Sequence, residues 1–394
     1  MIGIIYAFPY ILLFVLTLIL SLPIVRSINY LKVPGDSAYR YFVFACVFLF
    51  FFGFRGYIYT DWVVYAVFYD KLPNIGSLPD VCNFITSSEY ALVGWERGFL
   101  LYSILIKSIS FNYFSWQFIF VLNDFIVLIL VFRNYISQKN VVLCFLFFLM
   151  YGGIVIEFNL LRNSKALLFF YLSIKYLKDK KVVPYIVLNL IGALFHTASF
   201  LFIPLYFILN RKYSTKLVFL LYVVGNFIFI FRISWLLPII DVILHFFSLG
   251  RISLVMKDYI NSQSYGITLS YVQRLVEFLI IIFIGKKYVS YDKYYYLYNM
   301  FFLYHFVYLF FTEILVFVER FSILFVFSYW ILLPKFFENL TLKNKKIFLL
   351  FFFYWGLIVL IKSNSKVVCY YDNYLLNYLD YNERKLILDA FYNQ

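Results

Sequence analysis

Continuous apolar segments separated by short basic loops constrain this chain more than any other feature of its sequence. A membrane-spanning helix needs about 20 apolar residues, or fewer where the bilayer is thin. Segments of this kind cover residues 4–24, 41–54, 115–132, 141–156, 161–177, 182–195, 197–209, 217–231, 271–284, 295–312, 321–337 and 347–361. They lack the ten-residue alternation that is typical of membrane β-strands. We therefore predict an all-α fold, a polytopic integral membrane helical bundle with about 12 transmembrane spans.

Composition excludes the main alternatives to a membrane bundle. Hydrophobic residues make up 64% of the 394 positions and charged residues 14%, so a soluble fold would have no means of burying its apolar surface. Disorder requires the opposite composition, and four Cys are too few for a disulfide scaffold. Three His and four Cys without paired ligand spacing give no reason to expect a metal site. We predict one transmembrane domain over residues 1–394, with no cofactor.

The distribution of Lys and Arg predicts the orientation of the bundle. Gly98–Ser110 is apolar but short and contains Lys107, so we interpret it as a re-entrant or interfacial helix. The loops on one side then hold 19 Lys and Arg with four acidic residues, and those on the other side hold 13 with 14 acidic residues. The richer side is predicted to be cytoplasmic, which explains the net charge of +14 without nucleic-acid binding. Both termini and the loops 55–97 and 232–270 are predicted to lie outside.

Unusual polar residues converge on the predicted outer face, and each has an ordinary explanation beside a functional one. A charge near the end of a span can extend to the lipid head groups without any further role. Arg55 is either such a residue or a phosphate ligand, and Asp61 either caps the next helix or contacts a substrate. Glu96 either complements the N-terminus of the helix that follows it, or accepts hydrogen bonds from sugar hydroxyls or acts as a base.

The segment Glu157–Lys165 gives the sharpest signal in the sequence. Arg162 and Lys165 are spaced to share one face of the first turn of a predicted helix, where cations oppose the helix dipole. Their placement is explained if an anion occupies that end, held by backbone N–H groups and the two cations. The anion is either a substrate phosphate or a lipid head group.

A lone histidine interrupts the apolar run over residues 183–209. The run is too long for one span and short for two, so we predict a hairpin with His196 at its tip. His196 is either a hydrogen-bonded core residue or a group that exchanges protons near neutral pH. In a later span, Arg274 is spaced to pair with Glu277 and either neutralises it or contacts a substrate. Arg320 places a further cation at a predicted helix N-terminus on the outer face.

Five short motifs occur in order along most of the chain. They are Phe54-Arg55-Gly56 followed by Thr60-Asp61 and Tyr65, Glu96-Arg97-Gly98-Phe99 with Leu101, Phe158-Asn159 with Arg162 and Ala166, Phe195-His196-Thr197-Ala198-Ser199 after Ala193, and Glu319-Arg320-Phe321 with Phe325. In this pattern the chain resembles the EpsG/Wzy-type polysaccharide polymerases of bacteria. It departs from the pattern at Tyr59, where a Gly is common, and at Lys165, where a small residue is more usual.

The resemblance implies a GT-C-like glycosyltransferase of the bacterial inner membrane whose active site faces the periplasm. Such an enzyme joins oligosaccharide repeat units carried on undecaprenyl diphosphate, without a metal ion. His196 is the first candidate for the base and Glu96 the second, and Arg162 would stabilise the leaving lipid diphosphate. Substrate contacts are expected from Arg55, Asp61, Asn159, Lys165, Arg274 and Arg320.

The expected partners are the lipid-linked oligosaccharide and the bilayer, with a chain-length regulator as a further candidate. Two other functions fit the same residues. An O-antigen ligase-like glycosyltransferase would share the fold, the Arg and the His, but would transfer the glycan to lipid A core. A flippase for lipid-linked oligosaccharides would carry cations along a path across the membrane, whereas here they cluster at one face.

Overall fold

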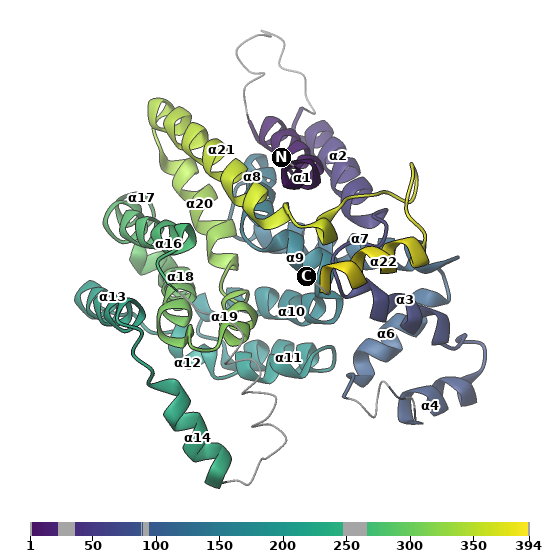
Figure 1. Cartoon of the computed structure of the whole chain (residues 1–394). Coiled ribbons are helices and arrows are strands. Elements are labelled where there is room, and N and C mark those ends of the chain that lie inside the picture. Colours follow the sequence, from purple (N-terminus) through teal and green to yellow (C-terminus); the bar gives the residue numbers. More distant parts are fainter. Residues whose placement is uncertain (1, 23–35, 88, 90–93, 247–265, 393–394) are drawn as a thin grey trace. The chain divides into compact units, whose positions relative to one another are not determined.

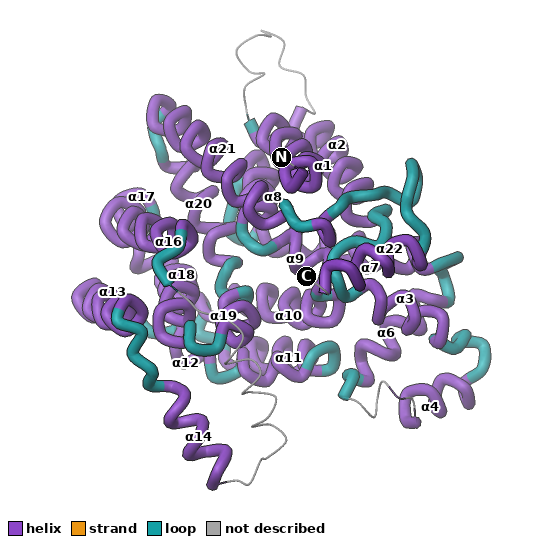
Figure 2. The backbone as a smooth tube through the Cα atoms, in the orientation of Figure 1, coloured by secondary structure: helices purple, strands orange, loops and turns teal. Residues whose placement is uncertain are grey.

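Helices form most of the chain that the computed structural model describes, which is residues 2–22, 36–87, 89, 94–246 and 266–392 (Figures 1 and 2). Within those ranges no β-strand occurs, and Asn373 forms isolated bridges with Arg55 and Asn377. The all-α class predicted from the apolar segments is therefore confirmed. Parts of the two predicted outer loops, residues 88, 90–93 and 247–265, lie outside the described residues, as do residues 26–35 of a predicted cytoplasmic loop.

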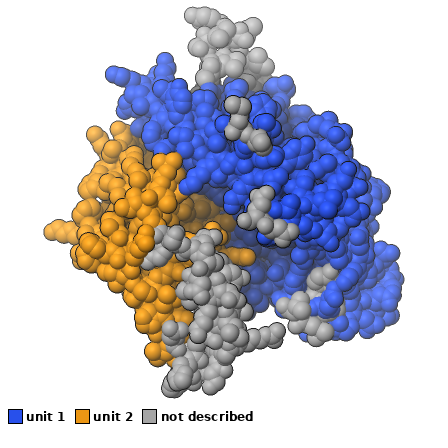
Figure 3. All heavy atoms as spheres, in the orientation of Figure 1, with its two compact units in different colours: residues 1–206, 340–394 blue, residues 207–339 orange. Residues whose placement is uncertain are grey.

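The chain forms two compact units, which Figure 3 colours separately. Unit 1 comprises residues 1–206 and 340–394, and unit 2 comprises residues 207–339. The helices of unit 1, with short 3-10 or π turns marked η, are α1 Ile2–Ser21, α2 Asp36–Phe48, η2 Leu49–Gly53, α3 Trp62–Lys71, α4 Leu78–Ser87, α6 Arg97–Lys107, α7 Tyr113–Arg133, η3 Gln138–Asn140, α8 Val141–Met150, α9 Gly153–Asn159, α10 Leu161–Lys178, α11 Val182–Ala193, η4 Thr197–Phe202, α21 Leu342–Asn364, η6 Val367–Cys369 and α22 Tyr381–Tyr392. Helix α12, Leu205–Leu209, contains the boundary between the units. Unit 2 holds α13 Thr215–Ile230, α14 Leu236–Phe246, α16 Leu269–Ile280, η5 Ile281–Gly285, α17 Lys286–Tyr288, α18 Tyr291–Phe311, α19 Leu315–Ser322 and α20 Phe327–Asn339.

Several helices have the length or composition of membrane spans. Among the described residues, the three that are long and apolar enough to cross a bilayer are Gly3–Ser21, Tyr113–Arg133 and Leu342–Asn364. A fourth candidate is the bent pair Gln138–Met150 and Gly153–Asn159, and shorter apolar helices cover Tyr39–Gly53, Val182–Ala193, Thr197–Leu209 and Thr215–Ile230. All of them coincide with apolar segments of the sequence, as a membrane protein requires. The total of twelve spans, the single domain and the GT-C-like arrangement stay predictions.

The short helix α6 corresponds to the apolar segment that contains Lys107. Its 11 residues extend about 16 Å at 1.5 Å per residue, roughly half of the hydrocarbon thickness. Lys107, which made a full span improbable, donates to the carbonyl oxygens of Tyr69 and Leu72 at 2.7 and 2.8 Å. These carbonyls end α3, where a cation complements the helix dipole. The interpretation of α6 as a re-entrant or interfacial helix stays a prediction.

Two breaks interrupt helices within apolar sequence. The α8–α9 pair bends by 72° at Gly152, whose φ of +79° is a conformation that favours glycine. The predicted hairpin in the 183–209 run is confirmed, because α11 ends at Ala193 and η4 begins at Thr197. His196 therefore lies in the connection between two apolar helices.

Two backbone positions explain the turn that follows η2. A Cβ at Gly56 would lie 2.2 Å from Oδ1 of Asp372, so no larger residue fits there without movement. Tyr59 has a φ of +67°, which costs a non-glycine residue on the order of 1–2 kcal/mol. Its hydroxyl donates to Asn364 at 2.8 Å, and its ring stacks on Phe158 at 5.4 Å. These contacts offset the strain.

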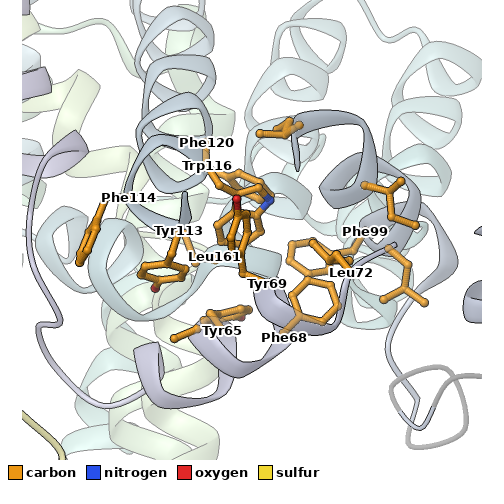
Figure 4. Packing of buried hydrophobic residues seen from close by; sticks show 14 of the residues in the cluster. Tyr65, Phe68, Tyr69, Leu72, Phe99, Tyr113, Phe114, Trp116, Phe120 and Leu161 are labelled. Carbon is orange, nitrogen blue, oxygen red and sulfur yellow. The ribbon is translucent and has the colours of Figure 1, made fainter. Parts of the chain in front are cut away.

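An aromatic core packs α3, α6 and α7 together with the start of α10 (Figure 4). Its central rings include Tyr65, Phe68, Phe99, Tyr113, Trp116 and Phe120, and Leu161 joins them from α10. The ring centroids of Trp116 and Phe120 lie 4.3 Å apart. Large buried rings dominate the energetics of such a core and hold the helices in one arrangement. The core therefore fixes α6 and α10, from which the candidate site is built.

Candidate functional site

Glu96 lies at the centre of a cluster of polar side chains in unit 1. Its Oε1 is 2.9 Å from Nδ1 of His196 and accepts the Thr197 backbone N–H at 2.8 Å. Its Oε2 accepts a hydrogen bond from Nη1 of Arg162 at 3.0 Å. The Glu96 side chain is 4% exposed, whereas those of Arg162 and His196 are each 23% exposed. The carboxylate is thus buried beneath two groups that a ligand can reach.

The surroundings of Glu96 keep it ionised. Burial raises the pKa of its carboxyl, but the hydrogen bonds from His196 and Thr197 and the charge of Arg162 outweigh burial and lower the pKa below its usual value. An ionised carboxylate only accepts hydrogen bonds, so Nδ1 of His196 carries the proton that is shared with Glu96. With the proton on Nδ1, the neutral form of the imidazole presents its lone pair on Nε2, as a general base requires.

The backbone of α6 brings Glu96 to the hairpin tip. Glu96 is the N-cap residue of α6, but its side chain makes no capping hydrogen bond, so the contact with His196 replaces the ordinary capping role considered from sequence. The Phe99 N–H donates to the Leu194 carbonyl at 3.1 Å. A Cβ at Gly98 would lie 2.5 Å from that same oxygen. Gly98 therefore permits the close approach that joins the two motifs.

Arg162 lies in the first turn of α10, as predicted. Its guanidinium lies over the Trp95 ring, 4.5 Å from the centroid, which orients the flat group beside Glu96. Tyr65 also belongs to this cluster: burial raises the pKa of its phenol to about 12, the charge of Arg162 lowers it and that of Asp61 raises it. Both charges are therefore within electrostatic reach of the Tyr65 hydroxyl. Sequence reasoning missed Trp95 and Thr197 as partners and assigned no role to Tyr65.

Asn159 holds the loop that carries Asp61. Its Oδ1 accepts the backbone N–H groups of Thr60 and Asp61 at 3.1 and 3.0 Å. The Thr60 hydroxyl donates to Oδ1 of Asp61 at 3.1 Å. Asp61 occupies the N-cap position of α3 without a side-chain capping bond. The geometry thus gives Asn159 a positioning role and does not use the Asp61 carboxylate as a cap.

Lys165 has a different partner from Arg162, although both lie in the first turns of α10. It forms an ion pair with Asp124 of α7 and donates to the Phe120 carbonyl at 3.0 Å. The side chains of Lys165 and Asp124 are 5% and 2% exposed, and Ser164 donates to Asp124 at 3.0 Å. The pair gives the Lys165 cation a partner inside unit 1. Lys165 and Arg162 therefore neutralise different carboxylates, whereas the sequence suggested a shared anion site.

We predict that Lys165→Met destabilises the protein, because it leaves the Asp124 carboxylate buried without its counter-ion. Removing one partner of a buried pair costs about 3–5 kcal/mol. The apparent Tm of the detergent-purified variant should fall, and adding Asp124→Asn should recover most of the loss. Lys178→Met, at the exposed end of the same helix, is the control. An unchanged Tm for Lys165→Met would contradict the pairing.

Arg55 is buried inside unit 1. The residue is 2% exposed, its Nη1 donates to the Phe52 carbonyl at 2.7 Å, and its guanidinium lies 4.9 Å from the Phe158 ring centroid. It therefore does not extend to the head groups. Its role as a phosphate ligand stays a prediction, and it would require Arg55 to become accessible.

The remaining two candidates belong to unit 2. The Arg274 guanidinium lies 4.3 Å from the ring centroids of both Tyr304 and Tyr308, and Glu277 accepts a hydrogen bond from the Tyr329 hydroxyl at 2.7 Å. Aromatic faces therefore help to accommodate the cation within this helical unit. A part for Arg274 in substrate binding stays a prediction.

Arg320 lies at the opposite end of a helix from the one predicted. It is exposed in the last turn of α19, which ends at Ser322, and the next helix begins at Phe327. The prediction of a helix N-terminus here is wrong, because Arg320 belongs to the preceding helix. A cation in a last turn complements the helix dipole, so its position needs no anion.

Comparison with known proteins matches most of the chain to one family. The model of the EpsG family matches residues 38–379, which include the Glu96 cluster, the Lys165–Asp124 pair and Arg274. No curated protein and no solved structure matches the chain. Among the described residues, no three His, Cys, Asp or Glu side chains gather as metal ligands would.

Proposed function

The chain belongs to the EpsG family, and on that premise we propose that it is a polysaccharide polymerase acting on undecaprenyl-diphosphate-linked repeat units. Membership of the family suggests polymerase activity, and the apolar helices indicate a membrane protein. We place the reaction at the outer face of the bacterial inner membrane, because the polar cluster lies on the side that the Lys and Arg distribution predicts to be outside.

The proposed reaction transfers the growing glycan from its lipid carrier to an incoming repeat unit. A hydroxyl group of the incoming non-reducing sugar attacks the anomeric carbon of the growing chain and forms the new glycosidic bond. The bond between that carbon and the lipid diphosphate breaks, and its electron pair leaves with the diphosphate. The hydroxyl proton passes to Nε2 of His196, and the Arg162 guanidinium stabilises the charge that grows on the bridging oxygen. In this scheme the transfer is metal-independent.

The joint binding of His196 and Arg162 by Glu96 is the observation that carries this proposal. One buried carboxylate fixes the tautomer of the base and the position of the cation, so proton removal and leaving-group stabilisation occur at a set separation. Glu96, considered from sequence as a base, becomes a positioning residue. Asp61 and Tyr65 lie near Arg162 and are assigned to sugar hydroxyls, which carboxylates and phenols can bind.

Profiling of surface glycans tests the proposed function. A strain lacking the gene should carry single repeat units where the wild type carries a ladder, and the wild-type gene should restore the ladder. Purified protein should also lengthen undecaprenyl-diphosphate-linked units in liposomes. Long polymer that persists on undecaprenyl diphosphate in the deletion strain would identify a ligase instead. Loss of surface glycan with unpolymerised units accumulating inside the cell would identify a flippase.

We predict that Gly98→Ala lowers polymerisation about 100-fold, because the added Cβ separates Glu96 from the hairpin tip. Displacements of about 1 Å have effects of this size on catalysis. The matched control is Gly76→Ala, since a Cβ at Gly76 meets no atom within 4 Å. Initial rates in liposomes, normalised to folded protein, measure the effect. Equal rates for the two variants would show that the approach of α6 to Leu194 is not needed.

A further inference from the structure

A groove in unit 1 begins beside the Glu96 cluster and continues along α10. It encloses about 160 Å³ between α7 and α10, with contributions from α6 and the hairpin tip. Its apolar walls are Val127 of α7, Leu168, Phe169 and Leu172 of α10, Phe195 of the tip and the Tyr102 ring of α6. We call it the α7–α10 groove.

Two residues connect this groove to the proposed catalytic site. Phe195, which lines the groove, directly precedes His196. Lys165, at the near end of the groove, lies one helical turn after Arg162, and Leu172 lies seven residues further along α10, about 10 Å away along the helix axis. The groove thus extends along α10 away from Arg162 and His196.

The polar groups in the groove wall are occupied by one another. Lys165 pairs with Asp124, and the Asn123 amide donates to the Tyr102 hydroxyl. These contacts leave apolar surface for an occupant, as a hydrocarbon requires. On α7, Ile126, which precedes the groove residue Val127 in the sequence, is 47% exposed. In a bilayer, an exposed apolar side chain at this position faces lipid.

We propose that the α7–α10 groove binds the first isoprene units of the polyprenyl diphosphate carrier. The inference rests on the proposed function, because that function supplies the lipid-linked substrate. In a polyprenyl diphosphate the anion is bonded directly to the hydrocarbon. Along α10 the exposed Arg162 is followed by Lys165, which is paired with Asp124, and then by the apolar groove residues Leu168, Phe169 and Leu172. The groove accordingly aligns the carrier along α10 while its diphosphate contacts Arg162. A larger groove of about 500 Å³ is formed by α1, α2, η2 and Tyr371, and none of its residues is next in sequence to a member of the Glu96 cluster, as Phe195 is to His196.

Photolabelling of the full-length protein in liposomes tests the assignment. The probe is geranylgeranyl diphosphate with a diazirine near the diphosphate end of its tail, and labelled peptides are mapped by mass spectrometry. We expect label on α7 and α10 around Val127, Leu168 and Leu172, and we expect undecaprenyl diphosphate to compete it away. Leu168→Trp should reduce that label about 10-fold, whereas Leu12→Trp, in the groove between α1 and α2, should not.

The outcomes separate this inference from the proposed function. Label concentrated around Leu12, or spread evenly over lipid-facing helices, would overturn the groove assignment even if the protein polymerises glycan. Competed label on α7 and α10 without polymerisation would support the groove and overturn the polymerase proposal. Because the mapping uses wild-type protein, it stands even if Leu168→Trp fails to fold, and Leu172→Trp then serves as the blocking variant.

Discussion

His196→Ala should lower the rate of polymerisation by about 100- to 10,000-fold, the range that a general base contributes. The hydroxyl of the acceptor sugar is a poor nucleophile until its proton is removed, and Nε2 of His196 is the accessible base beside Glu96. The variant should insert and fold, since its side chain is partly exposed at the hairpin tip. Initial rates in liposomes with defined lipid-linked units measure the loss.

A double-mutant cycle tests whether Glu96 acts through His196. Glu96→Gln should lower the rate by itself, because an amide can present its N–H to Nδ1 and stabilise the wrong tautomer. In the His196→Ala background, Glu96→Gln should lower the rate much less, apart from the part of its effect that acts through Arg162. Leu201→Ala, which removes a 49% exposed side chain from the same hairpin, is the control. Wild-type rates for His196→Ala would end its assignment as the base.

The sequence predicted those features of the site that depend only on neighbouring residues of the chain. An apolar run of unsuitable length predicted a turn at His196, and a short apolar segment with Lys107 inside it predicted a helix too short for an ordinary span, which α6 is with 11 residues. Both follow from the fixed rise of a helix and the thickness of a bilayer. The same reasoning located Arg162 in a first helical turn.

The partner of each charged residue could not be predicted from the sequence, because packing between distant segments of the chain determines it. Helical spacing grouped Arg162 with Lys165, but the structure pairs one with Glu96 and the other with Asp124. Asp124 and Lys165 are 41 residues apart, so periodicity within either helix carries no information on their contact. The close approach at Gly98 is likewise visible only once Leu194 is placed beside it.

Arg162→Ala should lower the rate of polymerisation by about 100- to 1,000-fold or more, because it removes the cation that meets the leaving diphosphate. Arg162→Lys should retain the charge and still lose about 10- to 100-fold. A lysine forms neither the planar two-bond contact with phosphate nor the flat contact that Arg162 makes with Trp95. Rates at saturating donor and inhibition by undecaprenyl diphosphate are the measurements.

Product inhibition distinguishes a direct contact with the diphosphate from a purely structural role for Arg162. If Arg162 binds the anion, Arg162→Ala weakens inhibition by undecaprenyl diphosphate, and Arg162→Lys restores part of it. If Arg162 only neutralises Glu96, inhibition is unchanged while the apparent Tm falls. Lys178→Ala removes a cation from the exposed end of the same helix and should change neither quantity. Unchanged inhibition in Arg162→Ala would therefore move the anion site elsewhere in the protein, with Arg274 as the next candidate.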